Sequence, residues 1–283
     1  MDIAPQVSLS PQRISQFLAD EGEPAVAVVV VETASSTNRE LEQLVTAETY
    51  QWDGPTLFAT TRQRAGRGRA GRDWVTPPDT ALTFSIHTWL DVPAEVATWL
   101  PLLVGSSVVD CVREYTHLSA HVKWPNDILV DTDEEPLEGW QNLRKIGGIL
   151  VEHTPQGGFI IGVGLNVSQT REQLPVAQAT SAYVCGAKIL DADRFLARCT
   201  AHILKNIAVW EECDGDVTRA GILDKTKAVS ATLGAQVRVE QPGKTPLCGV
   251  ALGFDVDGGL IVRDETGQTH TIRFGDVYHL RLD

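Results

Sequence analysis

A stretch rich in glycine and arginine, Thr61–Trp74 (TRQRAGRGRAGRDW), constrains the fold of this chain more than any other segment. The residues before and after it, Thr56–Thr61 and Ala81–Leu90, have the pattern of strands. Glycine permits positive φ and close backbone approach, and arginine grips carboxylates and phosphates through two N–H groups at once. The stretch is therefore suited to a loop between two strands that covers an anionic ligand, but a basic run taken alone is more often a solvated loop, and both interpretations stay open here.

The rest of the chain is acidic, which sets this basic stretch apart. Its 283 residues carry a formal net charge of −13, with a sequence pI near 4.9. This balance argues against broad binding to nucleic acid or anionic membranes. The first residues lack a secretory signal, and the longest apolar run, Ala25–Val31, is too short to span a bilayer. Five widely spaced cysteines without a C-x-x-C pair indicate reduced thiols, so we expect a cytoplasmic protein.

Hydrophobic periodicity predicts both helices and strands. Apolar residues at helical spacing predict helices over Ser8–Asp20, from Thr37 to Val45, within Pro93–Tyr115 and over Ala192–Trp210. Apolar and alternating runs predict strands over Ala25–Thr33, Lys145–His153 and Gly158–Val167, the last two as a hairpin. Thr37 and Glu40 have the spacing of a capping box at a helix start.

A polar cluster interrupts the segment His121–Val130 (HVKWPNDILV). Its residue pattern predicts a strand on each side of a turn that contains Pro-Asn-Asp. Lys123, Asn126 and Asp127 emerge at this break, and they indicate either a polar site or a bulge with an asparagine turn. The acidic stretch that follows, Asp131–Gln141, is predicted to be a solvated connection.

The sequence pattern changes near Lys227–Ala231, and short alternating runs separated by turns follow it. Short strands separated by glycine-containing turns are predicted over Gln236–Glu240, Gly249–Phe254, Leu260–Arg263, Thr269–Phe274 and Val277–Leu282. We predict an α+β fold with a catalytic domain over residues 1–228 and a small all-β domain over residues 229–283.

Two common nucleotide-binding motifs are excluded. No G-x-x-x-x-G-K-[ST] occurs, and Gly162-Val163-Gly164 lacks the third glycine and the following helix of a dinucleotide fingerprint. His117 and His121 have i,i+4 spacing, but the second falls at a strand start, so a metal pair is not expected.

Several segments in the same order resemble the motifs of the biotin protein ligases. They are the glycine- and arginine-rich loop Gly66–Trp74, the Lys-Trp-Pro-Asn-Asp segment Lys123–Asp127, the Lys-x-Gly-Gly-Ile-Leu strand Lys145–Leu150, the Gly-x-Gly-x-Asn strand Gly162–Asn166, and Ser36-Thr37-Asn38 at a helix start. The resemblance covers roughly residues 25 to 283. It implies a mixed central sheet with flanking helices, the class II synthetase-like biotin–lipoate ligase fold, and a C-terminal SH3-like β-barrel. The short lead before Ala25 leaves no room for the N-terminal DNA-binding domain of the repressor members, so a monofunctional enzyme is expected.

The resemblance also implies a reaction. Biotin and ATP would form biotinyl-5′-AMP and pyrophosphate, and biotin would then pass to a lysine of a biotin carboxyl-carrier domain of a carboxylase. The first step brings negative groups together, so fixed cations and Mg²⁺ must offset their repulsion. We expect no DNA or membrane partner, and a monomer or homodimer.

Site residues follow from the matched motifs. The implied catalytic residues are Lys145, Arg67, Arg69 and Asp127, with a Mg²⁺ site near Asp127. The implied biotin-binding residues are Ser36, Thr37, Asn38, Gln63, Gly66, Arg67, Gly68, Arg69, Trp74, Lys145, Gly147 and Gly148. The implied ATP- and adenylate-binding residues are Arg69, Arg72, Trp74, Lys123, Asn126, Lys145 and Asn166.

Three alternatives stay open at this point. One is a lipoate ligase or acyltransferase on the same fold, against which the arginine-glycine loop speaks. Another is a non-enzymatic nucleic-acid-binding module, which the acidic remainder and the lack of interleaved aromatic residues disfavour. The third is a purely structural β-containing domain, which leaves the lysine positions unexplained.

Overall fold

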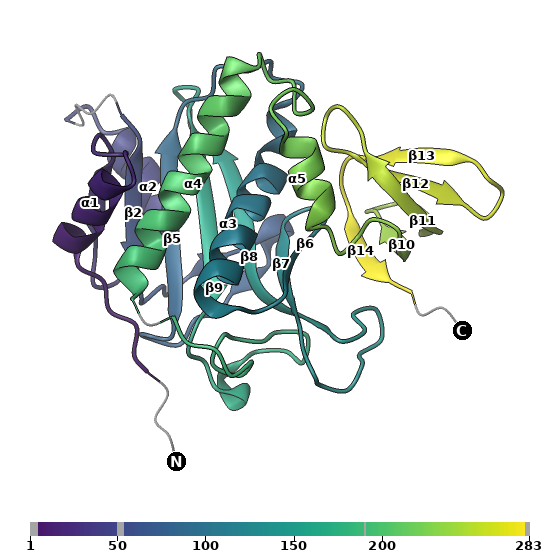
Figure 1. The fold of residues 1–283 in the computed structure, drawn as a ribbon, viewed down its shortest axis with the longest axis horizontal. Coiled ribbons are helices and arrows are strands. Elements are labelled where there is room, and N and C mark those ends of the chain that lie inside the picture. The colour runs from purple at the N-terminus through teal and green to yellow at the C-terminus, as the bar shows by residue number, and fades with distance from the viewer. Residues whose placement is uncertain (1–4, 50–53, 190, 281–283) are drawn as a thin grey trace.

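A seven-stranded mixed sheet forms the centre of the computed structural model, which describes residues 5–49, 54–189 and 191–280 (Figure 1). The strand order is β1-β2-β5-β9-β8-β7-β6. β1 pairs with β2 in parallel, and each of the other neighbouring pairs is antiparallel. The strands are β1 (Ala27–Val30), β2 (Thr56–Thr60), β5 (Ala81–Thr88), β6 (Ala120–Lys123), β7 (Asp127–Asp131), β8 (Leu143–His153) and β9 (Phe159–Asn166). The predicted mixed sheet and the β8–β9 hairpin are confirmed.

Helices cover both faces of this sheet. Three of them, α1 (Pro11–Asp20), α3 (Leu100–Thr116) and α4 (Ala192–Glu212), lie together on one face, and α2 (Thr37–Val45) lies on the other (Figure 1). The apolar face predicted for α4 is buried in the main core. A smaller core beneath α2 joins Leu41 to Phe58 and Ile160. The face that carries α2 also carries the arginine-rich segment.

The helix predicted within Pro93–Tyr115 is confirmed, and one further helix was not predicted. A short 3₁₀ turn, Ala97–Trp99, leads into α3. Pro101 occupies the first turn of α3, where its missing N–H costs nothing. A short helix, α5 (Ile222–Ala228), was not predicted, because its seven residues are too few to establish a periodicity.

The C-terminal part forms a five-stranded antiparallel sheet in the order β13-β12-β11-β10-β14. Its strands are β10 (Gln236–Glu240), β11 (Leu247–Phe254), β12 (Leu260–Asp264), β13 (Thr269–Ile272) and β14 (Asp276–His279). All five predicted strands are confirmed, except that the end of the last one, residues 281–282, lies outside the described residues. The ladder does not close between β13 and β14 among the described residues, so the sheet has the strands of the expected barrel with an open seam.

Tryptophan side chains connect the two sheets. Trp124 and Trp99 are almost completely buried, and their indole N–H groups donate to the backbone oxygens of Gly258 (3.0 Å) and Val256 (2.9 Å). Both acceptors belong to the turn between β11 and β12. The C-terminal sheet is therefore held against the β6–β7 side of the central sheet by buried hydrogen bonds (Figure 1).

The acidic connection after β7 is more tightly anchored than a solvated loop. Arg144, only 2% exposed, donates to the oxygens of Gln141 (3.0 Å) and Leu143 (2.9 Å) and pairs with Glu134 (3.1 Å). The carbonyl of Gly139 accepts a bond of 3.0 Å from the N–H of His279 in β14. The connection thus ties β7 and β8 to the edge of the C-terminal sheet.

The buried His279 predicts a loss of stability in acid. Burial, assisted by the positive charge of Lys123, lowers the pKa of His279 to about 4 from its ordinary 6.5. The unfolded chain therefore takes up this proton at a higher pH than the folded chain, so the contribution to stability is complete above pH 6.5 and is lost as the pH falls towards 4. We expect His279→Leu to reduce the fall in thermal midpoint between pH 7 and pH 4, measured by calorimetry. An equally steep fall in both proteins would contradict this assignment.

Candidate active site

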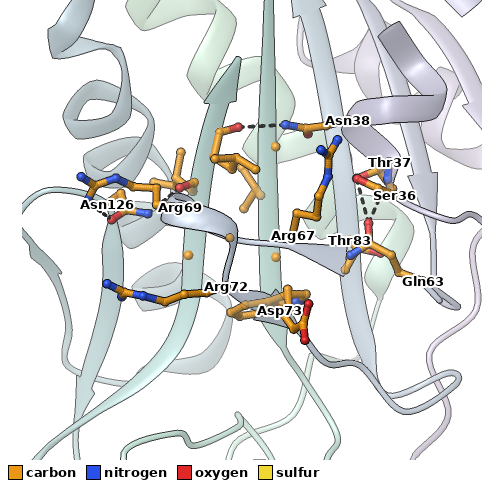
Figure 2. Close-up of a pocket in the computed structure, with 18 of the residues that line it drawn as sticks. Ser36, Thr37, Asn38, Gln63, Arg67, Arg69, Arg72, Asp73, Thr83 and Asn126 are labelled. Atoms are coloured by element: carbon orange, nitrogen blue, oxygen red, sulfur yellow. Dashed lines mark hydrogen bonds between the residues drawn. The ribbon is translucent and has the colours of Figure 1, made fainter. Parts of the chain in front are cut away.

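The arginine-rich segment folds as a short β-ribbon over the sheet. β3 (Gly66–Arg67) pairs with β4 (Asp73–Trp74), and the N–H of Gly68 donates to the oxygen of Arg72 across 2.7 Å. A 3₁₀ turn, Arg69–Gly71, forms the tip, where Ala70 and Gly71 both have positive φ. Figure 2 shows the ribbon crossing the pocket, with Arg67, Arg69 and Arg72 on it. The predicted loop over a ligand is therefore an ordered hairpin that covers a pocket.

The five arginines have different environments. Arg62 pairs with Asp79 (2.7 Å) and Glu32 (2.9 Å), and so it stabilises the base of the segment. Arg67, Arg69 and Arg72 line the pocket, whereas Arg64 does not. Arg67 has no ion-pair partner in the part of the chain that the structure describes, which leaves its guanidinium available to an anion.

The floor of the pocket consists of glycines from the central strands β8 and β9. Gly148 pairs with Gly164, and Gly162 pairs with Leu150. A Cβ atom at Gly164 would lie 2.6 Å from Cε2 of Trp74, and one at Gly162 would collide with the Oδ1 atom of Asn38. Because these glycines have no side chains, the indole of Trp74 and the amide of Asn38 can pack directly against the backbone of the sheet. The pocket encloses roughly 710 Å³, including the solvent at its mouth.

The start of α2 forms one wall. Ser36, Thr37 and Asn38 are each about 95% buried, and all three line the pocket (Figure 2). The Oε1 atom of Gln63, at the base of the ribbon, accepts from the N–H of Thr37 across 2.9 Å. The predicted capping box that starts at Thr37 is wrong. The N-cap residue is Ser36, and the carboxylate of Glu40 accepts a hydrogen bond from the N–H of Ser35. Gln63, distant in sequence, therefore satisfies the N–H that the helix leaves free.

A lysine and a carboxylate lie on the opposite wall. Nζ of Lys145 is 2.5 Å from Oδ1 of Asp127, and it lies 5.8 Å from the ring centre of Trp74. The β7–β8 register shifts here, because Ile128 faces Gly147 while Leu129 faces Lys145, which leaves Ile146 as an extra residue. The side chain of Lys145 then passes over Gly148, where a Cβ would lie 3.3 Å from Nζ. The bulge and the glycine together direct this ammonium group into the pocket.

Arg69 and Arg72 extend the positive wall. Nη1 of Arg69 donates to Oδ1 of Asn126 across 3.1 Å, and the Asn126 amide donates to the oxygen of Ile149 across 2.6 Å (Figure 2). Burial lowers the pKa of Arg69, and the negative charges of Asp276 and Asp127 act in the opposite direction. Arg72 forms an ion pair with Asp276 of β14, so the ribbon also contacts the C-terminal sheet.

Trp74 has an unsatisfied donor. Its Nε1 atom is buried and has no hydrogen-bond partner among the described residues. A buried N–H without a partner costs about 1–3 kcal/mol. The indole of Trp74 thus lies against Gly164 with its N–H unpaired.

Most of the predicted site residues line this one pocket. They are Ser36, Thr37, Asn38, Gln63, Arg67, Gly68, Arg69, Arg72, Trp74, Asn126, Asp127, Lys145 and Gly148. Their convergence from segments far apart in the chain agrees with the order of the motifs. The roles of the individual residues stay predictions.

Four predicted residues lie outside the lining. Gly66 belongs to β3 of the ribbon itself, where a Cβ would collide with Gln63, and Gly147 faces Leu165. Lys123 is 5% exposed, and its ammonium lies 4.3 Å above the ring of Trp140. Asn166 donates to the oxygen of Thr180 (2.9 Å) and accepts from Gln169 (2.9 Å). Their expected ligand contacts remain untested, and in this structure all four contact protein groups.

The sequence analysis did not assign several lining residues to the site. They are Asp73, Thr83, Ile149, Leu150, Gly162, Val163 and Gly164. Thr83 gives no local signal, because it belongs to an ordinary strand pattern. Gly162 and Gly164 were part of a recognised motif, and their spacing of two residues already placed them on one face of a strand.

The residues at the pocket do not form a metal-binding cage of their own. The described residues contain no group of three or more His, Cys, Asp or Glu side chains suited to a metal ion. The carboxylate of Asp127 is already engaged by Lys145. Mg²⁺ is commonly held by substrate phosphates with one or two carboxylates, and the Mg²⁺ site expected near Asp127 stays a prediction.

Two family models match the chain. The Biotin/lipoate A/B protein ligase family matches residues 30–167, and the Biotin protein ligase C terminal domain matches residues 232–280. The chain is 33% identical over 256 residues to the biotin–[acetyl-CoA-carboxylase] ligase of Mycobacterium tuberculosis, covering 89% of this chain and 88% of the relative. The chain thus belongs to the biotin protein ligase family.

Further comparisons agree with the fold and the family. A biotin protein ligase from Aquifex aeolicus, solved in complex with biotin and ATP, superimposes with a TM-score of 0.70 at 26% identity, over 90% of this chain and 99% of that one. The bifunctional ligase/repressor BirA of Bacillus subtilis is 30% identical over 224 residues, which are 75% of this chain and 62% of BirA. The expected division at residue 228 stays a prediction. No helix in the described ranges is long and apolar enough to cross a membrane.

Proposed function

We propose that the pocket under the ribbon binds biotin and ATP, forms biotinyl-5′-AMP with release of pyrophosphate, and passes the biotinyl group to a lysine of a biotin carboxyl-carrier domain. The observation that carries this proposal is the position of Lys145 and three arginines around one pocket whose floor is glycine. The names of the relatives and of the solved complexes support the choice of substrates. A cytoplasmic location is part of the same proposal.

The charges at the pocket suit the first step. An oxygen of the biotin carboxylate attacks the α-phosphorus of ATP, and the bond from that phosphorus to the departing pyrophosphate breaks. Both reactants are anionic, so Lys145, Arg67 and Arg69 lower the barrier by offsetting the negative charge that gathers between them. We assign to Asp127 the role of holding Lys145 in place, in keeping with their 2.5 Å contact.

The ribbon suits the second step. The carrier amine attacks the acyl carbon of the adenylate, and AMP leaves. Until then the mixed anhydride must be kept from water, which the ribbon and the Trp74 ring exclude from the pocket floor. Mg²⁺, when bound with ATP, would add positive charge at the phosphates.

Incubation with biotin, MgATP and a carrier domain tests the proposal. We expect the carrier to gain the mass of one biotinyl group on its lysine, as read by mass spectrometry. Lipoate in place of biotin tests the other branch of the matched family, and we expect it neither to be transferred nor to compete. Transfer of lipoate alone would overturn the proposal.

A nucleic-acid-binding role is not supported by the arrangement of the arginines. Arg67, Arg69 and Arg72 line a pocket, and Arg62 is neutralised by Asp79 and Glu32. A basic surface needs exposed, unpaired cations along one face.

Arg69→Gly tests how the ribbon retains the intermediate. Loss of the Arg69–Asn126 hydrogen bond and of one guanidinium weakens the ribbon over the adenylate. We expect adenylate formation to stay measurable, while the adenylate dissociates about tenfold faster or more. Release of labelled biotinyl-5′-AMP after rapid dilution measures this rate. Wild-type retention by the variant would refute the assignment.

A further inference from the structure

A chain of hydrogen bonds runs behind the pocket wall that the start of α2 forms, and it ends at a carboxylate that does not line the pocket. Nδ2 of Asn38 donates to Oε2 of Glu152 (2.7 Å) and to the oxygen of Leu150 (3.1 Å). Both protons of this amide are therefore committed to groups of β8. Figure 2 shows the Asn38 amide above the strands, with its bond to a backbone oxygen.

The other side of the same amide sets the direction of the next bonds. Oδ1 of Asn38 lies 2.6 Å from Oγ of Ser85, and this Oγ lies 2.8 Å from Oγ1 of Thr37. Oδ1 can only accept, so the single proton of Ser85 points to Asn38. Ser85 must then accept the proton of Thr37. The contact from Thr37 to Gln63, at 3.4 Å, is longer and competes weakly.

With the hydrogen bonds in these directions, Thr37 and Asn38 present only acceptors to the pocket. Thr37 has given its proton to Ser85, so its oxygen presents lone pairs, and Oδ1 of Asn38 keeps its second lone pair. The opposite orientation of Asn38 would bring its oxygen against the carboxylate of Glu152, which is unfavourable because neither group has a proton to donate. Glu152 therefore fixes the direction of the whole chain.

We propose that Glu152 is a positioning residue for biotin: by orienting Asn38, it makes the wall at Thr37 and Asn38 an acceptor for the ureido N–H groups. The inference rests on the proposed function, and it extends that function to substrate choice. A cyclic urea carries N–H donors for these acceptors, whereas the dithiolane ring of lipoate carries none. A site built to hydrogen-bond an N–H rejects a ligand that lacks it, because its buried acceptors are left unpaired.

Kinetics of biotin-dependent ATP–pyrophosphate exchange test the role of Glu152. For Glu152→Ala we expect the KM for biotin to rise about tenfold, the cost of one charge-assisted hydrogen bond, with kcat and the KM for ATP within about twofold of wild type. Glu152→Gln retains an acceptor and should recover most of the loss. Glu212→Ala, which removes an exposed charge at the end of α4, is the matched control.

A double-mutant cycle separates positioning from a merely structural effect. If Glu152 acts through Asn38, then Glu152→Ala adds less than twofold to the biotin KM of Asn38→Ala. Additive effects of the two substitutions, or an unchanged biotin KM in Glu152→Ala, would overturn the inference. Should Glu152→Ala fail to fold, Glu152→Leu, which fills a similar space but also lacks an acceptor for Asn38, takes its place in the same cycle, and an equal tenfold rise in both backgrounds refutes the inference. Failure of the wild-type protein to catalyse biotin-dependent exchange would instead refute the proposed function.

Discussion

Lys145→Ala is expected to lower the rate of biotin-dependent ATP–pyrophosphate exchange by a factor on the order of 10²–10³, the effect of losing one donor that stabilises developing charge. The ammonium group of Lys145 is the one that the bulge in β8 directs into the pocket. Its removal leaves the carboxylate of Asp127 without its 2.5 Å partner, next to two anionic substrates. The substitution therefore removes a favourable charge and exposes an unfavourable one.

Steady-state exchange and single-turnover adenylate formation measure this effect. Lys225→Ala provides a matched control, because this substitution removes a comparable ion pair, between Lys225 and Asp110, on the other side of the sheet. We expect the control to retain near wild-type exchange. An exchange rate within a few-fold of wild type for Lys145→Ala would refute the role assigned to this lysine.

Gly164→Ala is expected to weaken biotin binding by about ten- to hundredfold, the range of overpacking costs in a close-fitting site. The added Cβ would lie 2.6 Å from Cε2 and 2.8 Å from Nε1 of Trp74, so the indole must move away from the sheet. Trp74 belongs to β4, and its displacement moves the ribbon that carries the arginines. One methyl group on the floor thus disturbs the cover of the pocket.

Calorimetric titration with biotin, together with the thermal midpoint, measures the Gly164→Ala effect. Gly253→Ala is the matched control, since Gly253 also lies in a strand and its Cβ would meet no atom within 4 Å. We expect the control to bind biotin normally. Biotin binding by Gly164→Ala within twofold of wild type would show that the floor of the pocket tolerates a side chain.

The parts of the fold that depend on local pattern could be predicted from the sequence. The apolar face of α4 and the β8–β9 hairpin follow from periodicities of 3.6 and 2 residues, and both are confirmed. The family motifs also indicated which segments converge. Their order along the chain predicted the composition of the pocket better than any single motif did.

The details of the site depend on contacts between distant residues, which no local pattern encodes. Gln63 was assigned to biotin, but nothing near it in sequence shows that it also caps α2 at Thr37. Arg62 and Arg67 are chemically identical in the sequence, and only the positions of Asp79 and Glu32 turn the first away from the ligand. The register shift at Ile146 likewise becomes visible only when β7 is paired with β8.

The strand order of the central sheet has a consequence for how the enzyme is made. The residues that line the pocket include ones from β5, β9 and β8 in the middle of the sheet, and β5 pairs with β9 across about eighty residues of chain. Such non-local pairing slows folding, because the entropy of closing a long loop is lost before the contacts form. During synthesis, the ribbon and the start of α2 leave the ribosome well before the strand that they cover. The binding site therefore becomes complete only after β9 has joined the sheet.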